Sequence, residues 1–326
     1  MGALVRLNSF EEIAEGWQAM LSSCAIDTVF FTPQWQKVWW QELGQQKEML
    51  LLSFQPEDEI TGIAPLKREN GVISFLGDRD LYDYADVLVR KGHEDSFYNA
   101  LLDYLEGEPW ERLELFSLSQ DSCTLTHLAP LARQRGYEVE VREEDVVPGL
   151  SLPESWDAYL SSLSRKDRHE LRRKLRRLSS ETEYRCFTCS SPDELDQDLE
   201  SFFQLMAESQ EAKSRFLTPE RQKFFGHVAQ KMASLGFLRL FFLELQGERV
   251  ATVMCFDYGP VRFLYNSGFN PNYGYYSVGL LLKALCVKDA IENGRKYFDF
   301  LRGPEPYKYD LGATDRQLYE MVVKRS

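Results

Sequence analysis

The segment 261–308 reads VRFLYNSGFNPNYGYYSVGLLLKALCVKDAIENGRKYFDFLRGPEPYK and predicts a strand, a helix and a second strand in succession. The helix is expected over residues 278–292, where apolar residues recur on almost every side. Ser277 is a residue type that caps helix starts, and Gly279 lets a ligand come close to the backbone. Unpaired N–H groups and the dipole at such a start favour an anion such as a pyrophosphate, although plain capping with a packing glycine explains the same residues. The expected anion site consists of Tyr276, Ser277, Val278 and Gly279.

The composition describes a large, acidic globular chain. At 326 residues it is longer than one usual domain, and 44% hydrophobic residues are enough for a substantial core. The formal net charge of −13 argues against a surface that binds nucleic acid or an anionic membrane as a whole. The six cysteines are too sparse for a disulfide framework, and residues 1–6 hold no apolar signal core, so we expect a cytoplasmic location. Cys186 and Cys189 have CxxC spacing without a second pair, so no metal is expected.

The order of the expected elements occurs twice along the chain, which predicts two α/β domains with mixed sheets flanked by helices. Residues 143–157 are rich in acidic residues, proline and glycine and are expected to connect the halves. The predicted domains are therefore 1–150 and 151–326, and the last strand, 318–324, falls in the second. The other expected strands are 49–54, 60–66, 72–76, 84–89, 112–116, 237–245, 250–258, 261–268 and 297–301. The other expected helices are 10–21, 35–43, 94–105, 125–133, 195–207 and 219–235.

The strongest local charge is the run RKDRHELRRKLRR at residues 165–177, which predicts a helix. Ser164 and Asp167 form a plausible capping pair at its start. Its leucines form one apolar stripe, which leaves a cationic face outward that includes Arg172. That face is either a solvated surface, a site for the phosphate of a nucleotide-linked substrate, or a site for an RNA backbone.

Five short blocks of sequence together resemble a known family. At these residues the chain is similar to the GNAT-fold acetyltransferases of the CelD-like group of cellulose-biosynthesis proteins, which are relatives of the FemABX peptidyltransferases. The resemblance covers nearly the whole length. It implies two tandem GNAT-like domains, with an acyl-CoA at 276–279 in the C-terminal domain and the acceptor on the N-terminal side. The blocks are 31–35, 164–173, 276–279, 299–303 and Tyr307-Lys308.

The loop after the last strand of segment 261–308 gathers the candidate catalytic residues. Acyl transfer from a thioester needs a base, donors for the oxyanion and a proton for the leaving thiolate. The resemblance places Lys308 opposite a phosphate or the developing oxyanion. We expect Glu305 or Asp299 to take the proton, Tyr307 to protonate sulfur, and Arg302 to contact substrate. The alternative is that Asp299 only caps the end of a strand and that Glu305 and Lys308 are loop charges in water.

In the first half, Tyr84 and Asp86 precede a strand, and the resemblance places them on the acceptor side. A solvated turn is the alternative interpretation. The helix start in this half carries Glu94 and Asp95, and these carboxylates would compete with a phosphate for the same N–H groups. We therefore expect only the second half to hold the cofactor.

Three hypotheses for function follow. The first is an N- or O-acetyltransferase that uses acetyl-CoA as co-substrate, without a metal, and acts on a sugar-like or other small polar acceptor. The second is a peptidyltransferase that uses aminoacyl-tRNA, docked on the cationic helix. The third is a non-catalytic binding protein, because the Gln/Arg-x-x-Gly-x-Gly loop common in the wider superfamily is not spelled out here.

Overall fold

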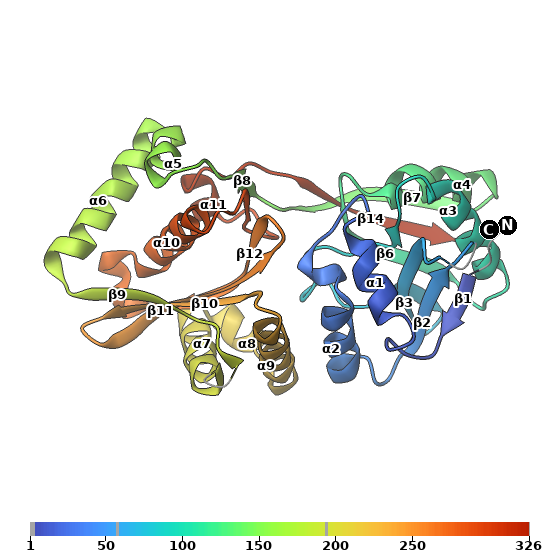
Figure 1. Ribbon diagram of the computed structural model, residues 1–326, viewed down its shortest axis with the longest axis horizontal. Helices are drawn as coiled ribbons and strands as arrows, with labels where there is room; N and C mark the ends of the chain where they lie inside the picture. Colours follow the sequence, from blue (N-terminus) through green and yellow to red (C-terminus); the bar gives the residue numbers. More distant parts are fainter. Residues whose placement is uncertain (1–3, 57–58, 193–194, 326) are drawn as a thin grey trace. The chain divides into compact units, whose positions relative to one another are not determined.

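The computed structural model describes residues 4–56, 59–192 and 195–325. The chain forms two units, Met1–Val146 with Arg316–Ser326, and Val147–Asp315, each built around one mixed sheet flanked by helices (Figure 1). The two-sheet α/β architecture expected from the sequence is confirmed. No helix in the described ranges is both long and apolar enough to cross a bilayer.

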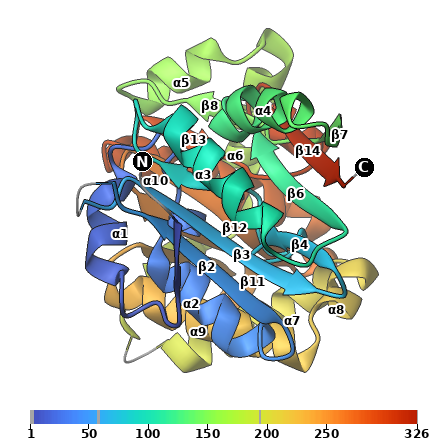
Figure 2. The same cartoon turned by 90° about the vertical axis from the view of Figure 1, so that its right-hand side faces the viewer.

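The sheet of the first unit has the strand order β1-β2-β3-β4-β6-β14-β7, with β5 paired to β3. Only β4 and β6 run parallel, and the other pairs are antiparallel. Figure 2 shows α3 lying over this sheet. The strands are β1 (Leu4–Leu7), β2 (Glu48–Phe54), β3 (Gly62–Glu69), β4 (Val72–Phe75), β5 (Leu88–Val89), β6 (Arg112–Ser119), β7 (Glu138–Val146) and β14 (Gln317–Lys324). The helices are α1 (Ala14–Leu21), α2 (Pro33–Leu43), α3 (Glu94–Glu106) and α4 (Ala129–Gln134), with short turns η1 (Val29–Phe31) and η2 (Thr124–Leu128).

The meander β2-β3-β4 confirms the strands expected in this region. Asn70 and Gly71 turn the chain between β3 and β4 with φ of 49° and 77°, the left-handed backbone that these two residue types tolerate best. Helix α2 begins two residues before the expected helix 35–43, and the Thr32 hydroxyl caps it by accepting a hydrogen bond from the Trp35 N–H at 3.3 Å.

The last strand corrects the predicted domain division. β14 lies between β6 and β7 and pairs antiparallel with both, so the second domain does not extend to residue 326. Its buried side chains, Leu318, Met321 and Val323, belong to the core of the first unit. The boundary expected after residue 150 falls after Val146, and the expected connection 143–157 contains the end of β7 and all of β8.

The sheet of the second unit has the order β8-β13-β12-β11-β10-β9. Helices α5, α6, α10 and α11 lie on one face of this sheet and α7, α8 and α9 on the other (Figure 1). The strands are β8 (Gly149–Ser151), β9 (Tyr184–Cys189), β10 (Leu238–Leu245), β11 (Glu248–Tyr258), β12 (Val261–Phe269) and β13 (Tyr297–Asp299). The helices are α5 (Trp156–Ser162), α6 (Arg165–Glu181), α7 (Leu195–Ser209), α8 (Glu211–Phe216), α9 (Pro219–Ser234), α10 (Val278–Glu292) and α11 (Pro306–Asp310), with the 3-10 turn η4 (Pro271–Tyr276) before α10.

Helix α10 has the bounds that its sequence predicts, and it is buried on the sheet. Leu281, Leu282 and Val287 are fully buried and share a core with Phe241 and Val253 of the sheet. A helix that is apolar on nearly all sides can be stable only in such a setting, between a sheet and further helices. This packing fixes the position of the helix start.

One ion cluster is buried below α10. Arg262 has no exposed side-chain surface, and its guanidinium donates to both carboxylate oxygens of Asp257 at 2.6 and 2.9 Å. It also bonds Asp289 of α10 at 2.6 Å and the Cys286 carbonyl at 3.1 Å. These bonds tie β11, β12 and α10 together.

Candidate active site

Strands β12 and β13 pair over three residues and then part. The parallel register joins Val261–Phe263 to Tyr297–Asp299, after which β13 ends while β12 continues to Phe269. A bulge in β12 lies just beyond, because Met254 of β11 faces Asn266 whereas Cys255 faces Leu264. Beyond Phe263 the β12 edge toward β13 is therefore open to other groups.

The start of α10 lies against the end of β12. A Cβ atom on Gly279 would come within 2.9 Å of the Phe269 ring, so this glycine is required for close packing. Val278 and Gly279 are buried, and Tyr276 and Ser277 are half-buried. The Leu281 N–H donates to the Ser277 carbonyl at 3.0 Å, and the amides before it are those that a helix start leaves unpaired. The packing interpretation of Gly279 is confirmed, and the approach of a ligand here stays a prediction.

The prediction that the Ser277 side chain caps this helix was wrong. Ser277 has a φ of 56°, in the left-handed region, and makes no capping bond with its side chain. Serine in an ordinary cap has an extended backbone, which directs its hydroxyl to the first-turn amides. The left-handed turn at Ser277 removes that geometry and leaves the amides of the first turn without this acceptor.

Lys308 closes the loop that follows β13. Its side chain is 2% exposed, and Nζ donates to the carbonyls of Leu301, Arg302 and Gly303 at 2.8, 2.7 and 2.9 Å. The Glu305 carboxylate lies 2.9 Å from the same nitrogen. An ammonium has three hydrogens, so four acceptors leave none for a ligand. The structure thus assigns Lys308 to holding the loop and argues against the expected role facing an oxyanion.

The other residues of this loop have mixed surroundings. Asp299 is buried and accepts a hydrogen bond from the Leu301 N–H at 2.8 Å, which agrees with the strand-end alternative. Leu301 has a φ of 60°, and the loop is bent sharply at this point. Arg302 is half-buried. The Glu305 side chain is about half exposed, so its carboxylate is open to solvent on one side.

Tyr307 and two further lysines lie beside this loop. Burial raises the pKa of the Tyr307 phenol well above its usual value, so the group keeps its proton at neutral pH. Lys283 of α10 is buried, with Nζ 4.5 Å from the centre of the Tyr307 ring. Lys213 of α8 donates to the Asn266 side-chain oxygen at 3.2 Å and to the Ser267 carbonyl. The sequence reasoning missed both lysines, because each occurs alone among unrelated residues.

Helix α6 carries the cationic face expected from the sequence. Its side chains border a groove of about 1140 Å³ that is lined by five cationic residues and a single carboxylate, Glu170. Glu170 is bonded to Arg173 at 2.7 Å, while Arg172 is exposed in the groove. Arg177 donates to the Tyr275 carbonyl at 2.7 Å and lies 4.5 Å from its ring centre, which joins α6 to the turn before α10. The cationic lining residues are Arg165, Lys166, Arg168, Arg172 and Arg176.

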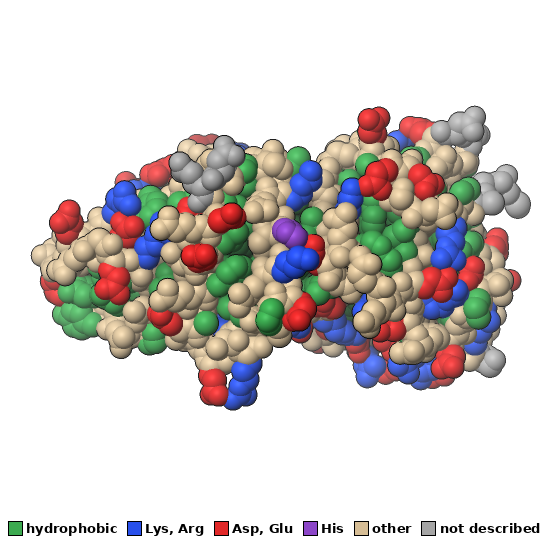
Figure 3. All heavy atoms as spheres, turned by 90° about the horizontal axis from the view of Figure 1, so that it is seen from below, with side chains coloured by type: hydrophobic (Ala, Val, Ile, Leu, Met, Phe, Trp, Pro, Cys, Tyr) green, Lys and Arg blue, Asp and Glu red, His purple; other side chains and the backbone are tan. Residues whose placement is uncertain are grey.

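The face drawn in Figure 3 has a different character. Acidic and basic side chains lie intermixed there over both units. The excess of positive charge along α6, where Glu170 pairs with Arg173 and Lys174, contrasts with the formal net charge of −13 of the whole chain.

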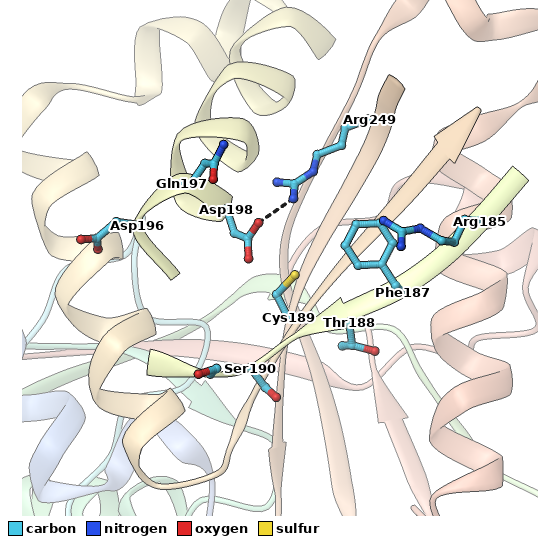
Figure 4. A pocket seen from close by; sticks show the side chains of 10 residues that line it. Arg185, Phe187, Thr188, Cys189, Ser190, Asp196, Gln197, Asp198 and Arg249 are labelled. Atoms are coloured by element: carbon cyan, nitrogen blue, oxygen red, sulfur yellow. Dashed lines mark ion pairs between the residues drawn. The ribbon is translucent and has the colours of Figure 1, made fainter. Parts of the chain in front are cut away.

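A second hollow of about 860 Å³ lies between β9 and α7 (Figure 4). Arg249 and Asp198 form an ion pair of 2.7 Å in its wall, and the Arg185 guanidinium stacks 4.2 Å from the Phe187 ring centre. Cys189 points into the same space. The CxxC pair lies on strand β9. In the described ranges no three His, Cys, Asp or Glu side chains gather closely enough to hold a metal ion.

The residues expected to bind the acceptor in the first unit are part of its core. Tyr84 is 2% exposed and packs near Phe30. Asp86 is 6% exposed and accepts hydrogen bonds from Ser122 at 2.5 Å, from Thr124, and from its neighbouring amide. Burial raises the pKa of Asp86 to about 6, against the opposing effect of the hydroxyl donors. Both side chains hold the segment that leads into β5 in place. Their burial contradicts the expected contact with a substrate.

The corresponding helix start in the first unit carries the acidic residues Glu94 and Asp95 in its first turn. The Glu94 carboxylate accepts a hydrogen bond from the Gly92 N–H at 2.7 Å, directly before α3. This agrees with the expectation that acidic residues at this start compete with a phosphate.

Comparison with known proteins agrees with this architecture. Residues 165–309, from α6 to α11, match the family model of the acetyltransferase (GNAT) domain. Among solved structures, FemX has a TM-score of 0.65 at 12% identity, over 97% of this chain and 96% of that one. L-PGS from Bacillus licheniformis has a TM-score of 0.56 at 11% identity, over 90% and 91%. A tandem GNAT protein from the clavulanic acid biosynthesis pathway has a TM-score of 0.54 at 10% identity, over 98% of each chain.

A search of the curated proteins finds no match. The structural similarities confirm the tandem GNAT-like fold, and the domain match identifies the second unit as an acyltransferase domain. The narrower CelD-like assignment stays a prediction.

Proposed function

We propose that the chain is an acyl-CoA-dependent acyltransferase, with acetyl-CoA as donor, that acylates an amino or hydroxyl group of a small polar, sugar-like acceptor. The cytoplasm is its proposed location. The observation that supports this most is the start of α10, whose first amides lie at the end of β12 where β12 and β13 part. The pyrophosphate of the donor would bind these amides, as the helix dipole favours. The GNAT domain match covers the whole of this region.

The proposed chemistry uses the open edge of β12 and the loop after β13. The amine or hydroxyl of the acceptor attacks the thioester carbonyl, and a backbone N–H group of β12 beyond Phe263, where β13 no longer pairs with the strand, stabilises the oxyanion. The half-exposed Glu305 carboxylate takes the proton of the nucleophile. As the proposed acid, Tyr307 is protonated at neutral pH and donates a hydrogen bond to the leaving sulfur. Because burial raises the pKa of the phenol, the proton that the thiolate takes up comes from solvent or from the carboxyl of protonated Glu305. Lys308 contributes by fixing the loop that carries Glu305 and Tyr307.

The first test is calorimetric binding of acetyl-CoA to the wild type and to Ser277→Asp. Aspartate tolerates the left-handed backbone at this position and adds a carboxylate beside the α10 amides. We expect acetyl-CoA affinity to fall by roughly tenfold or more, because a pyrophosphate and a carboxylate repel each other across a few ångströms. Ser277→Asn is the control with the same shape and no charge, and it should keep near wild-type affinity. Absence of acetyl-CoA binding by the wild type would overturn the proposal.

A second candidate donor is aminoacyl-tRNA, which the cationic groove along α6 favours. In that case the double variant Arg172→Glu, Arg176→Glu should lose aminoacyl transfer and should retain acetyl transfer to a small acceptor. The affinity of the wild type for tRNA should also fall steeply as the salt concentration rises, since phosphate contacts release counter-ions. Arg112→Glu with Arg142→Glu, at two exposed positions in the first unit, is the control for the same change in total charge. If tRNA neither binds nor donates, the small-molecule donor remains.

A further inference from the structure

Two amino groups of the second unit, that of buried Lys283 and that of half-buried Lys213, have no carboxylate partner in an ion pair among the described residues. Lys283 is 6% exposed, and its Nζ makes one long contact, 3.3 Å, with the Gly279 carbonyl of its own helix. Lys213 bonds only neutral oxygens, those of Asn266 and Ser267. In the described part of the chain neither ammonium takes part in an ion pair. Buried charges are normally paired, so each lacks the counter-ion that burial calls for.

These lysines reach one region from opposite faces of the sheet. Lys213 comes from α8, on the face with α7 and α9, while Lys283 comes from α10 on the other face (Figure 1). Lys213 is anchored to β12 beyond the last residue that pairs with β13. Lys283 lies over the ring of Tyr307, in the helix that follows the loop after β13. Both therefore border the region where the two strands part.

The contacts of the two lysines place them in the same region. The Lys283 Nζ contacts the Gly279 carbonyl, and Gly279 packs against Phe269, two residues beyond the Ser267 carbonyl that Lys213 bonds. Burial, together with the positive charges of Lys213 and Lys308, lowers the pKa of Lys283 to about 7, against the opposing effects of Cys286 and Glu305. Burial also lowers the pKa of Lys213 to about 8. Glu305 pairs with Lys308 at 2.9 Å, and its negative charge is the one carboxylate that opposes the lowered pKa of both Lys213 and Lys283. The region is short of negative charge.

We infer that an anionic group of the substrate, a carboxylate or a phosphate, binds between the amino groups of Lys213 and Lys283 beside the Tyr307 ring. Such an anion supplies the missing counter-ion and keeps both lysines protonated. The inference rests on the proposed function in one respect: Tyr307 is the proposed acid, so the negative charge lies close to the reacting thioester. The preferred acceptor then carries an acidic group near its nucleophile, unless the anion belongs to the donor.

The test is thermal unfolding at pH 7 and constant ionic strength with malonate or inorganic phosphate, and with chloride as the reference. The wild type should gain roughly 3 °C or more in Tm, with saturation, as expected for a ligand well above its Kd. Lys213→Met and Lys283→Met should each lose this gain. Lys288→Met is the matched control, because Lys288 is an exposed lysine of the same helix paired with Glu292 at 3.6 Å. If the wild type gains nothing, or all four proteins gain equally, the inference is overturned.

Both lysine variants should fold, since each removes a buried charge and keeps an apolar side chain of similar length. Saturating acetyl-CoA identifies the source of the anion. If acetyl-CoA abolishes the malonate effect, the site takes a phosphate of the donor. If the effect persists, the site takes the acidic group of the acceptor. An acceptor series of amines with a carboxylate or its carboxamide should then show at least a tenfold lower KM for the acid, lost in Lys283→Met.

The anion test and the acetyl-CoA test can fail separately. Malonate stabilisation needs no donor, so it can be present in a protein that does not bind acetyl-CoA. Acetyl-CoA binding that survives in Lys213→Met and Lys283→Met, with no malonate effect in the wild type, would remove this inference and leave the proposed function standing.

Discussion

Replacement of Lys308 by methionine distinguishes a loop-holding lysine from a catalytic one. In the structure its Nζ is bonded to three loop carbonyls and to Glu305 at distances between 2.7 and 2.9 Å. The same loop contains Leu301 and Gly303, with φ of 60° and 105°. Backbone of this kind persists only where surrounding bonds hold it. Methionine fills the buried channel of the side chain but removes all four bonds.

The expected loss can be worked out from these bonds. A hydrogen bond to a charged group contributes about 1.5–3 kcal/mol, so four would suggest roughly 6–12 kcal/mol. Two terms offset that sum: the ammonium no longer has to be desolvated, and the half-buried carbonyls of Arg302 and Gly303 regain water. We expect a net destabilisation of about 3 kcal/mol.

The assay is urea unfolding together with hydrogen exchange of peptides covering residues 299–310. Lys308→Met should lower the unfolding free energy by about 3 kcal/mol and speed exchange in this loop. Glu305→Gln removes only the half-exposed carboxylate charge and should cost less than about 1 kcal/mol. If Lys308→Met keeps wild-type stability and loop protection but abolishes thiol release from acetyl-CoA, the loop-holding assignment is refuted and the lysine acts on the substrate.

Three further predictions concern α10 and its surroundings. Arg262→Met removes the nearest cation of buried Asp257 and leaves it with the more distant Arg239 (3.3 Å) and Arg295 (3.9 Å). The free energy of unfolding in urea should fall by about 3–4 kcal/mol, and a fall below about 1 kcal/mol would contradict this. Lys283 has a pKa of about 7 in the folded state and an ordinary value near 10.5 when unfolded, so its burial penalty is complete below pH 7 and vanishes as the pH approaches 10.5. Lys283→Met should therefore raise Tm most at pH 6 and least at pH 10, by roughly 2–4 kcal/mol of unfolding free energy at the acidic end, and a Tm difference independent of pH would count against it. Gly279→Ala places a methyl group about 2.9 Å from the Phe269 ring. It should lower the free energy of unfolding by about 1 kcal/mol, although alanine has the better helix propensity. Phe269→Leu in the same chain should restore the Tm, because it removes the ring.

Helices and strands that are recognisable from their own apolar residues could be predicted from the sequence. Helix α10 and strands β10, β11 and β12 are each a run of mostly apolar residues, because each is buried along most of its length. Strand β7 could not be recognised, since it lies at the edge of its sheet, pairs only with β14, and has mostly exposed, charged side chains. The π-helical turn at Thr124–Leu128 was likewise expected as ordinary helix.

The candidate site was only partly predictable for the same reason. Residues 276–279 and 299–308 were predicted as one region because they are close in sequence, and the contact of Lys283 with the Tyr307 ring does join α10 to the loop region. The binding and catalytic roles of these residues stay predictions. Tyr84 and Asp86 were expected at a surface, and their burial depends on Ser122 and Thr124, more than thirty residues away along the chain. Polar residue type alone does not distinguish a buried, satisfied carboxylate from an exposed one.

The class of fold, the second unit's main helices and strands, and the cationic face of α6 could be read from the sequence, because each depends on spacing within one element. The return of β14 to the first sheet and the bonding of Lys308 to its own loop are visible only in the folded chain. The same is true of Lys213, which bonds β12, and of Lys283, which lies over the Tyr307 ring. These results depend on which strands are neighbours and on which face of the sheet each helix packs. Such choices are set by the burial of the whole chain, and no local pattern of residues records them.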